Sequence, residues 1–365
     1  MNIVLFFAII FALTFILGKL LEKIRIPWIF AALLIGLGLA VYNPFFEITS
    51  GQTFKFMAQL GMYFLLFIIG FELDIKEIMK CRAFIFKSTI FIILAEAFIG
   101  SLFVHYILDV HWLVSILLAT SFATVGEAAL LPILDEFKLV KTKFGQTVLG
   151  IGVLDDVFEV LTFIFLSLIL AKHFATNSIN LEVNVGLTIF ILITLTALMF
   201  LLIYFKKYLQ HFNYKDVPSF FIVFLFFIFL FIGIGQLADV AALAAILAGV
   251  ALKNIMPDKL LALADKEIRA MAYGFFAPLF FLSVGLDVNV SYLLKYPLLV
   301  LFFMILIKGT KIVASIIMGK KVFGLKKSIL LGISLSVKFS TSIVIIKVLF
   351  DKGLIDGNVF SIFIG

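Results

Sequence analysis

Long apolar runs separated by short polar loops dominate the pattern of this chain. A run of about 20 residues with few charges has the length that an α-helix needs to cross a hydrocarbon core of about 30 Å. The runs cover residues 2–20, 27–43, 54–72, 83–108, 112–134, 144–171, 185–205, 217–234, 238–252, 266–286, 296–318 and 327–349, and another begins near residue 356. The pattern predicts an all-α polytopic membrane protein with about 13 spans.

The distribution of basic residues supports this layout. Of the 29 Lys and Arg residues, 21 lie in alternate loops, which the positive-inside rule assigns to the cytoplasmic side. The first basic cluster, Lys19, Lys23 and Arg25, follows the first span, as in a signal anchor and not in a cleaved signal peptide. We therefore expect a multi-pass protein of the cell (plasma or inner) membrane, with its N-terminus outside and its C-terminus cytoplasmic.

Composition excludes several other classes of protein. The chain is 64% hydrophobic with a mean hydropathy of +1.24, which fits a protein surrounded by the lipid bilayer. The net charge of +7 comes from short loops without a basic aromatic surface, so no nucleic acid is expected as a partner. The single cysteine, Cys81, excludes an internal disulfide, and the four histidines lack the spacing of metal ligands. We expect no cofactor and no transition metal.

An internal repeat appears when the chain is shifted along itself by 213 residues. The matching segments are residues 31–36 with 244–249, 73–74 with 286–287, and 115–118 with 328–331. The shift divides the chain into a first inverted repeat at residues 1–171, a linker span at 185–205 and a second repeat at 217–365. Because the linker adds one span, corresponding spans enter the membrane from opposite sides. This is the inverted-repeat architecture of secondary transporters, in which broken helices near the midplane bind the substrate.

Carboxylates interrupt the apolar span at residues 144–171. Asp155, Asp156 and Glu159 follow Gly150 and Gly152 in a segment that is otherwise apolar. Each charge at the centre of a spanning helix costs about 2.5–3.5 kcal/mol, so adjacent acids persist there when something binds or titrates them. Neighbouring carboxylates in a low dielectric cannot easily both stay ionised, and we expect this pair to titrate as a coupled unit. Cations and protons are the candidate ligands.

Two predicted spans contain polar stretches at mid-membrane depth. Residues 120–127 of the fifth span read Thr-Ser-Phe-Ala-Thr-Val-Gly-Glu, and residues 334–340 lie at the corresponding position of the twelfth. Small hydroxyl residues, β-branched residues and Gly weaken a helix, so we expect both spans to be broken and to cross. Unwound carbonyls there would coordinate a cation. In the alternative interpretation, the Ser and Thr side chains bond back within intact helices.

Two stretches resemble a known family. Residues 59–74, and residues 119–156 with Pro132-Ile133-Leu134-Asp135-Glu136-Phe137 and the terminal Asp155-Asp156 pair, resemble the monovalent cation/proton antiporter superfamily. The resemblance is nearest the electrogenic Asp-Asp sodium/proton antiporter branch, with potassium/proton exchangers as close relatives. It implies a homodimeric secondary antiporter that exchanges Na⁺ or Li⁺ for H⁺. Potassium/proton exchange is the alternative, and a cation channel or a bile-acid-type sodium symporter fits less well.

The resemblance also implies roles for individual residues. Asp156 is the carboxylate at which a Na⁺ ion and a proton would compete. Asp155 is expected to pair with a lysine embedded in the membrane, Lys308, although Lys311 one turn later could take that place. The break in the fifth span adds Thr124 and Val125 as ion-binding candidates.

Other charged positions are weaker candidates. Glu127 and Lys338 form a possible pair across the helix crossing, and Glu159 and Glu96 could line the pathway. A nucleophile with a neighbouring base, or a metal cluster, would be needed for a membrane enzyme, and the sequence contains neither pattern. We therefore expect a transporter and not an enzyme.

Overall fold

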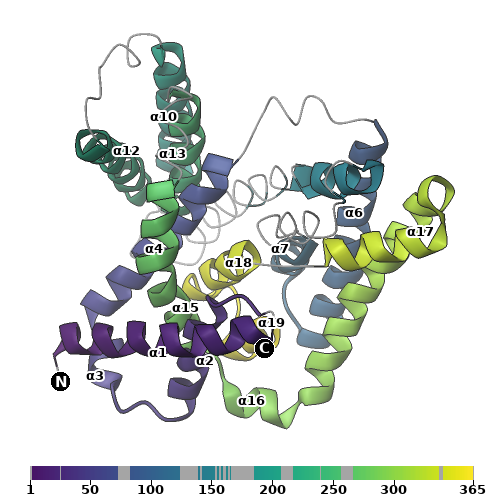
Figure 1. The fold of residues 1–365 in the computed structure, drawn as a ribbon, viewed down its shortest axis with the longest axis horizontal. Coiled ribbons are helices and arrows are strands. Elements are labelled where there is room, and N and C mark those ends of the chain that lie inside the picture. Colours follow the sequence, from purple (N-terminus) through teal and green to yellow (C-terminus); the bar gives the residue numbers. More distant parts are fainter. Residues whose placement is uncertain are drawn as a thin grey trace. The chain divides into compact units, whose positions relative to one another are not determined.

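The computed structural model of the chain is helical in every regular element that it describes (Figure 1). The described residues are 2–24, 26–72, 83–123, 139, 142–152, 154–155, 158, 162, 165, 185–206, 217–238, 240–255, 266–336 and 340–364. Among them, 6 helices are long and apolar enough to cross a membrane, and four apolar helices are shorter. The expectation of an all-α multi-pass protein is confirmed, whereas the count of about 13 spans stays a prediction.

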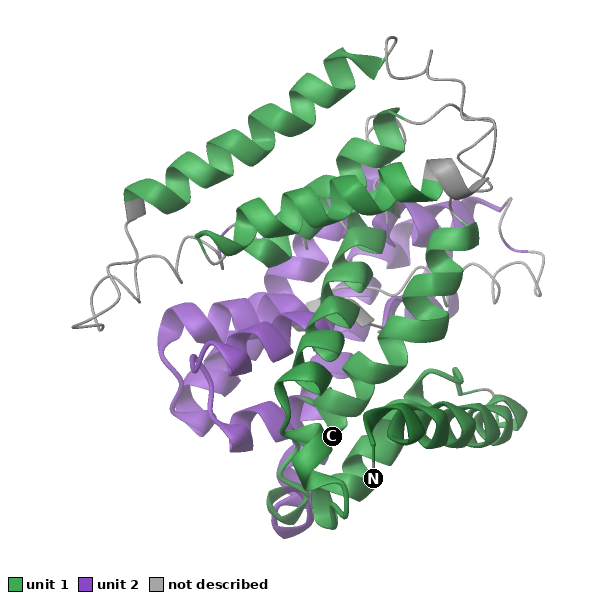
Figure 2. Cartoon of the chain, turned by 90° about the vertical axis from the view of Figure 1, so that its left-hand side faces the viewer, with its two compact units in different colours: residues 1–72, 167–292, 364 green, residues 73–166, 293–363, 365 purple. Residues whose placement is uncertain are grey.

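The chain forms two compact units, and each unit combines segments from both halves of the sequence (Figure 2). Unit 1 contains residues 1–72, 167–292 and 364, and unit 2 contains residues 73–166, 293–363 and 365. The expected division into two consecutive repeats and a linker span stays a prediction, and each unit combines segments of the first and second halves of the chain.

Unit 1 contains helices from both predicted repeats and the predicted linker span at residues 185–205. They are α1 (Ile3–Lys23), α2 (Phe30–Val41), α3 (Phe46–Thr49), α4 (Gln52–Glu72), α10 (Val185–Tyr204), α12 (Val217–Gln236), α13 (Ala241–Ile255), η1 (Ala272–Phe276) and α15 (Ala277–Leu286). Helix α1 begins at Asn2, whose side chain accepts a 2.8 Å hydrogen bond from the Leu5 amide. This bond satisfies one of the backbone donors that a helix start leaves without an intrahelical partner.

Two close helix crossings hold unit 1 together at corresponding positions of the predicted repeats. A Cβ at Gly36 of α2 would overlap the Leu282 carbonyl oxygen of α15, and a Cβ at Gly249 of α13 would overlap the Phe67 carbonyl oxygen of α4. Gly36 and Gly249 are 213 residues apart, and each contacts a helix of the opposite half of the chain. Such backbone contact between spanning helices needs small residues at the crossing.

Unit 2 contains α6 (Ala83–Leu108), α7 (Trp112–Ala123), a helical stretch at residues 143–152, α17 (Pro297–Leu335), α18 (Ser340–Asp351) and α19 (Gly357–Ile364). Along the chain, the division between the two units falls within the short helix α16 (Val290–Lys295), after Tyr292. Helix α6 has the predicted bounds. Helix α17 ends at Leu335, and α18 begins at Ser340. Both ends lie within the polar stretch where the twelfth span was expected to break.

The lysine-rich segment between the eleventh and twelfth predicted spans differs from the expected loop. Helix α17 runs through it, and only Gly324 has a non-helical conformation, with φ +77° and ψ 169°. Gly tolerates this left-handed φ because it lacks a Cβ, so a single residue can separate the two helical parts. Lysine favours helix, which explains why the flanking basic residues extend the helices and do not form a longer loop.

Candidate ion-binding site

A buried ion pair joins α6 to α17 within unit 2. The Lys311 ammonium nitrogen lies 3.2 Å from a carboxylate oxygen of Glu96, and the two side chains are 1% and 0% exposed. Removing two such charges from water costs several kcal/mol per ion, so a buried pair needs a specific partner geometry to persist. In a spanning segment, charged groups of this kind mark ion or proton pathways.

Lys311 also contacts the end of the broken helix. Its ammonium group donates a 3.0 Å hydrogen bond to the carbonyl oxygen of Leu335, the last residue of α17. The last four carbonyls of a helix have no intrahelical donor, and the C-terminus carries a partial negative charge. Lys311 therefore satisfies one of these carbonyls and compensates that charge, so one side chain links Glu96 of α6 with the helix end at the interruption.

The same two helices carry further buried polar groups near the ion pair. Glu96 and Ser88 lie two turns apart on α6, and Lys311 and Ser315 lie one turn apart on α17. Both serine side chains are 0% exposed, and neither hydroxyl has a hydrogen-bond partner among the described residues. Buried polar groups normally have partners, so these two hydroxyls are candidate contacts for water or for an ion.

Asp155 lies in the interior of unit 2, at 1% exposure. One turn before it, Ile151 belongs to an apolar cluster that also contains Val148, Ala314 and Leu335. Ala314 lies three residues after Lys311 on α17, and the carbonyl of Leu335 accepts the hydrogen bond from Lys311. The turn that precedes Asp155 therefore packs on the part of α17 that carries the ion pair.

The two candidate lysines occupy different environments. Lys308, which was expected to face Asp155, has an exposed side chain on α17, whereas Lys311 is buried. Residues three positions apart on a helix project about 60° from each other, so one can face the interior while the other does not. The structure thus favours Lys311, the alternative that the sequence left open, as the interior lysine.

The remaining candidates lie outside the described residues, and their assignments stay predictions. They are Asp156, Thr124, Val125, Glu127, Glu159 and Lys338. Within the described part of the chain, no group of three or more His, Cys, Asp or Glu side chains could hold a metal ion.

The pairing of Glu96 with Lys311 was not foreseen, although both residues were weaker candidates. A signal for it is present in α6, where Ser88, Ile92, Glu96 and Gly100 recur every four residues and therefore share one face. A polar or small residue at three of these positions indicates a face that packs on another helix around a buried charge. The Leu335 carbonyl has no sequence signal, because any residue at a helix end would supply it.

Comparison with known proteins found a matching family and several similar proteins. Residues 9–365 match the family described as "Sodium/hydrogen exchanger, transmembrane". The chain is 27% identical to "Probable Na(+)/H(+) antiporter 3" of Methanocaldococcus jannaschii, over 97% of this chain and 90% of the relative. It is 24% identical to a "Na(+)/H(+) antiporter" of Enterococcus hirae, over 83% of this chain and 78% of the relative.

A potassium system and a solved structure also match. The chain is 23% identical to "Glutathione-regulated potassium-efflux system protein KefC" of Klebsiella pneumoniae, over 71% of this chain but only 41% of that protein. The fold is similar to that of the sodium proton antiporter MjNhaP1 from Methanocaldococcus jannaschii, with a TM-score of 0.65 and 17% identity. The similarity covers 99% of this chain and 92% of the solved chain.

Proposed function

This chain belongs to the transmembrane sodium/hydrogen exchanger family, and we propose that it is a secondary antiporter that exchanges Na⁺ for H⁺ across the membrane. The observation that carries the proposal is the group of buried charges, Asp155, Glu96 and Lys311, inside one helical unit. Two relatives that the chain matches over most of their length are named as sodium/proton antiporters, one of them as a probable one, which supports the choice of Na⁺.

The proposed mechanism is competition between Na⁺ and a proton at Asp156, beside the buried Asp155. A bound cation displaces the proton from the carboxylate, and a proton displaces the cation when the site faces the other side. Because the two states share one carboxylate, the protein cannot carry both ions at once. This coupling makes the downhill flux of one ion drive the other uphill.

We assign to Lys311 the role of the interior lysine near the aspartate pair. Its burial, its ion pair with Glu96 and its bond to the Leu335 carbonyl favour this residue over the exposed Lys308. In this proposal Lys311 and Glu96 are positioning residues: they hold the end of α17 in place next to the carboxylates. The buried Ser88 and Ser315 hydroxyls would contact water along the same face.

Proteoliposomes test the proposed exchange. Purified protein is reconstituted with an acidic interior, and the release of protons is followed with a pH-sensitive dye after Na⁺, Li⁺ or K⁺ is added outside. We expect saturable alkalinisation of the vesicle interior that depends on external Na⁺ or Li⁺. Cation flux that does not saturate and needs no counter-ion would indicate a channel and would contradict the proposal.

Potassium/proton exchange is the second candidate, because potassium-efflux proteins are among the relatives. The chain spans less than half of those proteins, whereas it spans most of the sodium/proton antiporters, so Na⁺ remains our first choice. A larger alkalinisation with K⁺ than with Na⁺ at equal concentrations would reverse this order.

We further propose that the chain is oriented with its N-terminus outside, in the cell (plasma or inner) membrane. The alternating distribution of basic loops supports this orientation. Lys55 and Lys321 are exposed and are expected on the outer and cytoplasmic sides, respectively. Two variants, each in a Cys81→Ser background, test this with a membrane-impermeant thiol reagent. Lys55→Cys is expected to react only from outside, and Lys321→Cys only from inside.

We also propose a homodimer, on the basis of the resemblance to the antiporter superfamily. Light scattering of the purified protein, with the detergent contribution subtracted, measures its mass directly. A mass of twice 40.8 kDa is expected, and a monomer at all protein concentrations would contradict the proposal.

A further inference from the structure

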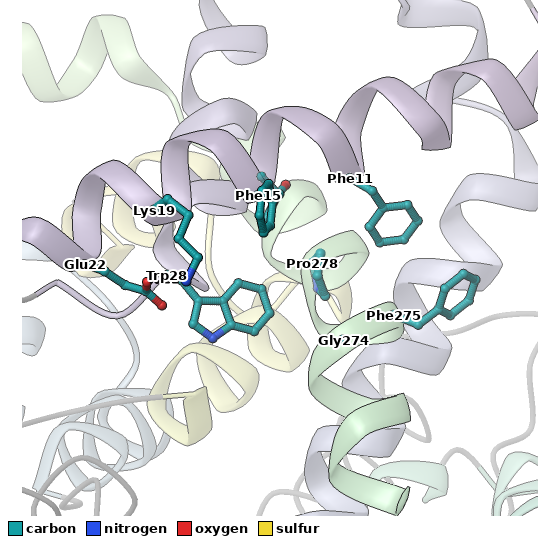
Figure 3. Close-up of a pocket in the computed structure, with 9 residues that line it drawn as sticks. Phe11, Phe15, Lys19, Glu22, Trp28, Gly274, Phe275 and Pro278 are labelled. Atoms are coloured by element: carbon teal, nitrogen blue, oxygen red, sulfur yellow. Dashed lines mark hydrogen bonds and ion pairs between the residues drawn. The ribbon is translucent and has the colours of Figure 1, made fainter.

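A groove of about 490 Å³ lies on unit 1, apart from the candidate ion-binding residues (Figure 3). It is formed by α1, the loop before α2, and the η1–α15 segment. The residues that line it are Phe11, Thr14, Phe15, Lys19, Glu22, Trp28, Gly274, Phe275 and Pro278. Its volume is within the range of about 300–1,000 Å³ that is typical of small-molecule sites.

The groove is apolar at one end and charged at the other. Phe11 and Phe275 stack at the apolar end, with ring centroids 5.5 Å apart (Figure 3). At the other end the Lys19 ammonium donates a 2.8 Å hydrogen bond to the Glu22 carboxylate, and Trp28 lies beside them. Lys and Trp at the end of a spanning helix are typical of the membrane–water interface, so the groove extends from that interface toward the apolar core.

A proline opens the wall of the groove. Pro278 has no amide hydrogen, so it cannot donate to the Gly274 carbonyl four residues earlier. The π-helical turn η1 lies just before Pro278, and it is wider than an α-helical turn. A Cβ added at Gly274 would meet no atom within 4 Å, so this wall faces open space.

Thr14 presents an unused polar group between the two ends. Its side chain is 2% exposed, and its hydroxyl has no hydrogen-bond partner among the described residues. Thr89 and Thr147 differ, because they donate to the carbonyl four residues earlier, at 2.9 and 2.8 Å, whereas the buried Thr188 of α10, outside the groove, also has no partner among the described residues. A buried hydroxyl without a partner costs about 1–3 kcal/mol, so the groove favours a ligand with an acceptor at this level.

We propose that the groove binds one phospholipid molecule with a phosphoethanolamine headgroup. An acyl chain packs among Phe11, Phe15 and Phe275, an ester carbonyl accepts from Thr14, and the headgroup reaches Lys19 and Glu22. Thr14 and Lys19 are separated by about 7.5 Å along the helix axis, a distance that the glycerol backbone and the phosphate can span.

Charge complementarity selects this headgroup. Lys19 pairs with the phosphate, and Glu22 accepts hydrogen bonds from the ethanolammonium group, so both protein charges keep a partner. An anionic phosphoglycerol headgroup would leave the Glu22 carboxylate without a cation. A choline headgroup has the positive charge but no N–H donor, and charged hydrogen bonds contribute about 1.5–3 kcal/mol.

Fluorescence quenching of Trp28 tests the proposal. The only other tryptophan, Trp112, lies in unit 2, and Trp112→Phe makes Trp28 the single reporter. Delipidated full-length protein in detergent is titrated with phosphatidylethanolamine that carries bromine atoms on its acyl chains. We expect saturable quenching in this background, and about tenfold weaker apparent affinity when Gly274→Leu fills the groove.

Gly38→Leu is the matched control, because a Cβ at Gly38 also meets no atom within 4 Å but this residue does not line the groove. Its quenching curve is expected to match that of the parent. Equal curves for Gly274→Leu and Gly38→Leu would show general contact with the surrounding lipid only and would overturn the proposal.

The headgroup is tested separately with Glu22→Gln. The parent is expected to bind brominated phosphatidylethanolamine about tenfold more tightly than brominated phosphatidylcholine, and Glu22→Gln is expected to remove this preference. Glu47→Gln, an exposed acid of unit 1 outside the groove, is the control and should retain it. A parent protein without the preference would overturn the assignment.

Discussion

Lys311 and Glu96 form an ion pair in the interior of unit 2, with 3.2 Å between the ammonium nitrogen and the nearer carboxylate oxygen. The lysine also holds the carbonyl of Leu335 at the end of α17. These two contacts join one continuous helix, α6, to the point where another helix stops. A site for a small cation needs this kind of support, because an interrupted helix has fewer backbone hydrogen bonds of its own to fix its geometry.

The first prediction concerns the stability that depends on Lys311. Lys311→Gln leaves the Glu96 carboxylate buried without its cation, and removal of one partner of a buried pair typically costs about 3–5 kcal/mol. We expect a clear loss of thermal stability of the purified protein in detergent. Lys308→Gln is the matched control: its side chain is exposed, and a change within about 0.5 kcal/mol is expected. Equal losses in both variants would contradict the assignment.

A second prediction separates the structural role of the pair from its role in transport. Glu96→Gln combined with Lys311→Gln removes both charges, so the double variant should be more stable than the sum of the single losses predicts. The coupling is expected at about 0.5–3 kcal/mol. If Lys311 supports exchange by holding the helix end, the double variant recovers stability but not the rate of Na⁺-dependent proton release. Recovery of both the stability and the rate of proton release would show that the ion pair has a structural role only.

A third prediction concerns the helix crossings of unit 1. Gly249→Ala places a Cβ against the Phe67 carbonyl oxygen, and the backbone there cannot move without separating α13 from α4. Overpacking of this kind typically costs about 1–3 kcal/mol. Gly233→Ala on α12, where a Cβ meets no atom within 4 Å, is the control and should leave the melting temperature nearly unchanged. Equal melting temperatures of the two variants would show that α13 and α4 can move apart at this crossing without a loss of stability.

Much of the fold follows from the sequence because the bilayer imposes length and hydropathy on each span. Helix α6 has the predicted bounds, and α10 differs by one residue at its end, since an uninterrupted apolar run has no competing structure. The segment around Gly324 was harder to predict, because lysine-rich residues fit either a loop or two helix ends. The π-helical turn η1 was not predicted, because Pro278 shows that a backbone donor is missing in this span but not which local geometry replaces its hydrogen bond.

The candidate site was predictable in its residue types but not in its pairing. A lysine in an apolar span is conspicuous, yet Lys308 and Lys311 are both in that position, and only the rotation of α17 decides which one faces the interior. Glu96 is the only acidic residue of its predicted span, and its partner depends on which helix packs beside α6. The four-residue spacing of Ser88, Glu96 and Gly100 indicates the packing face of α6 but does not identify the helix that packs there.

The last prediction addresses the carboxylate at which the two ions are proposed to compete. Asp156→Asn removes the titratable group but keeps nearly the same size, so the protein should insert and fold while Na⁺-dependent proton release is abolished. Asp109→Asn is the control, because Asp109 is exposed at a φ of +53°, a conformation that asparagine also tolerates. The control should exchange like the parent. Exchange by Asp156→Asn at the parent rate would refute the proposed role of Asp156 and would direct the search to Asp155, the other acid of the pair.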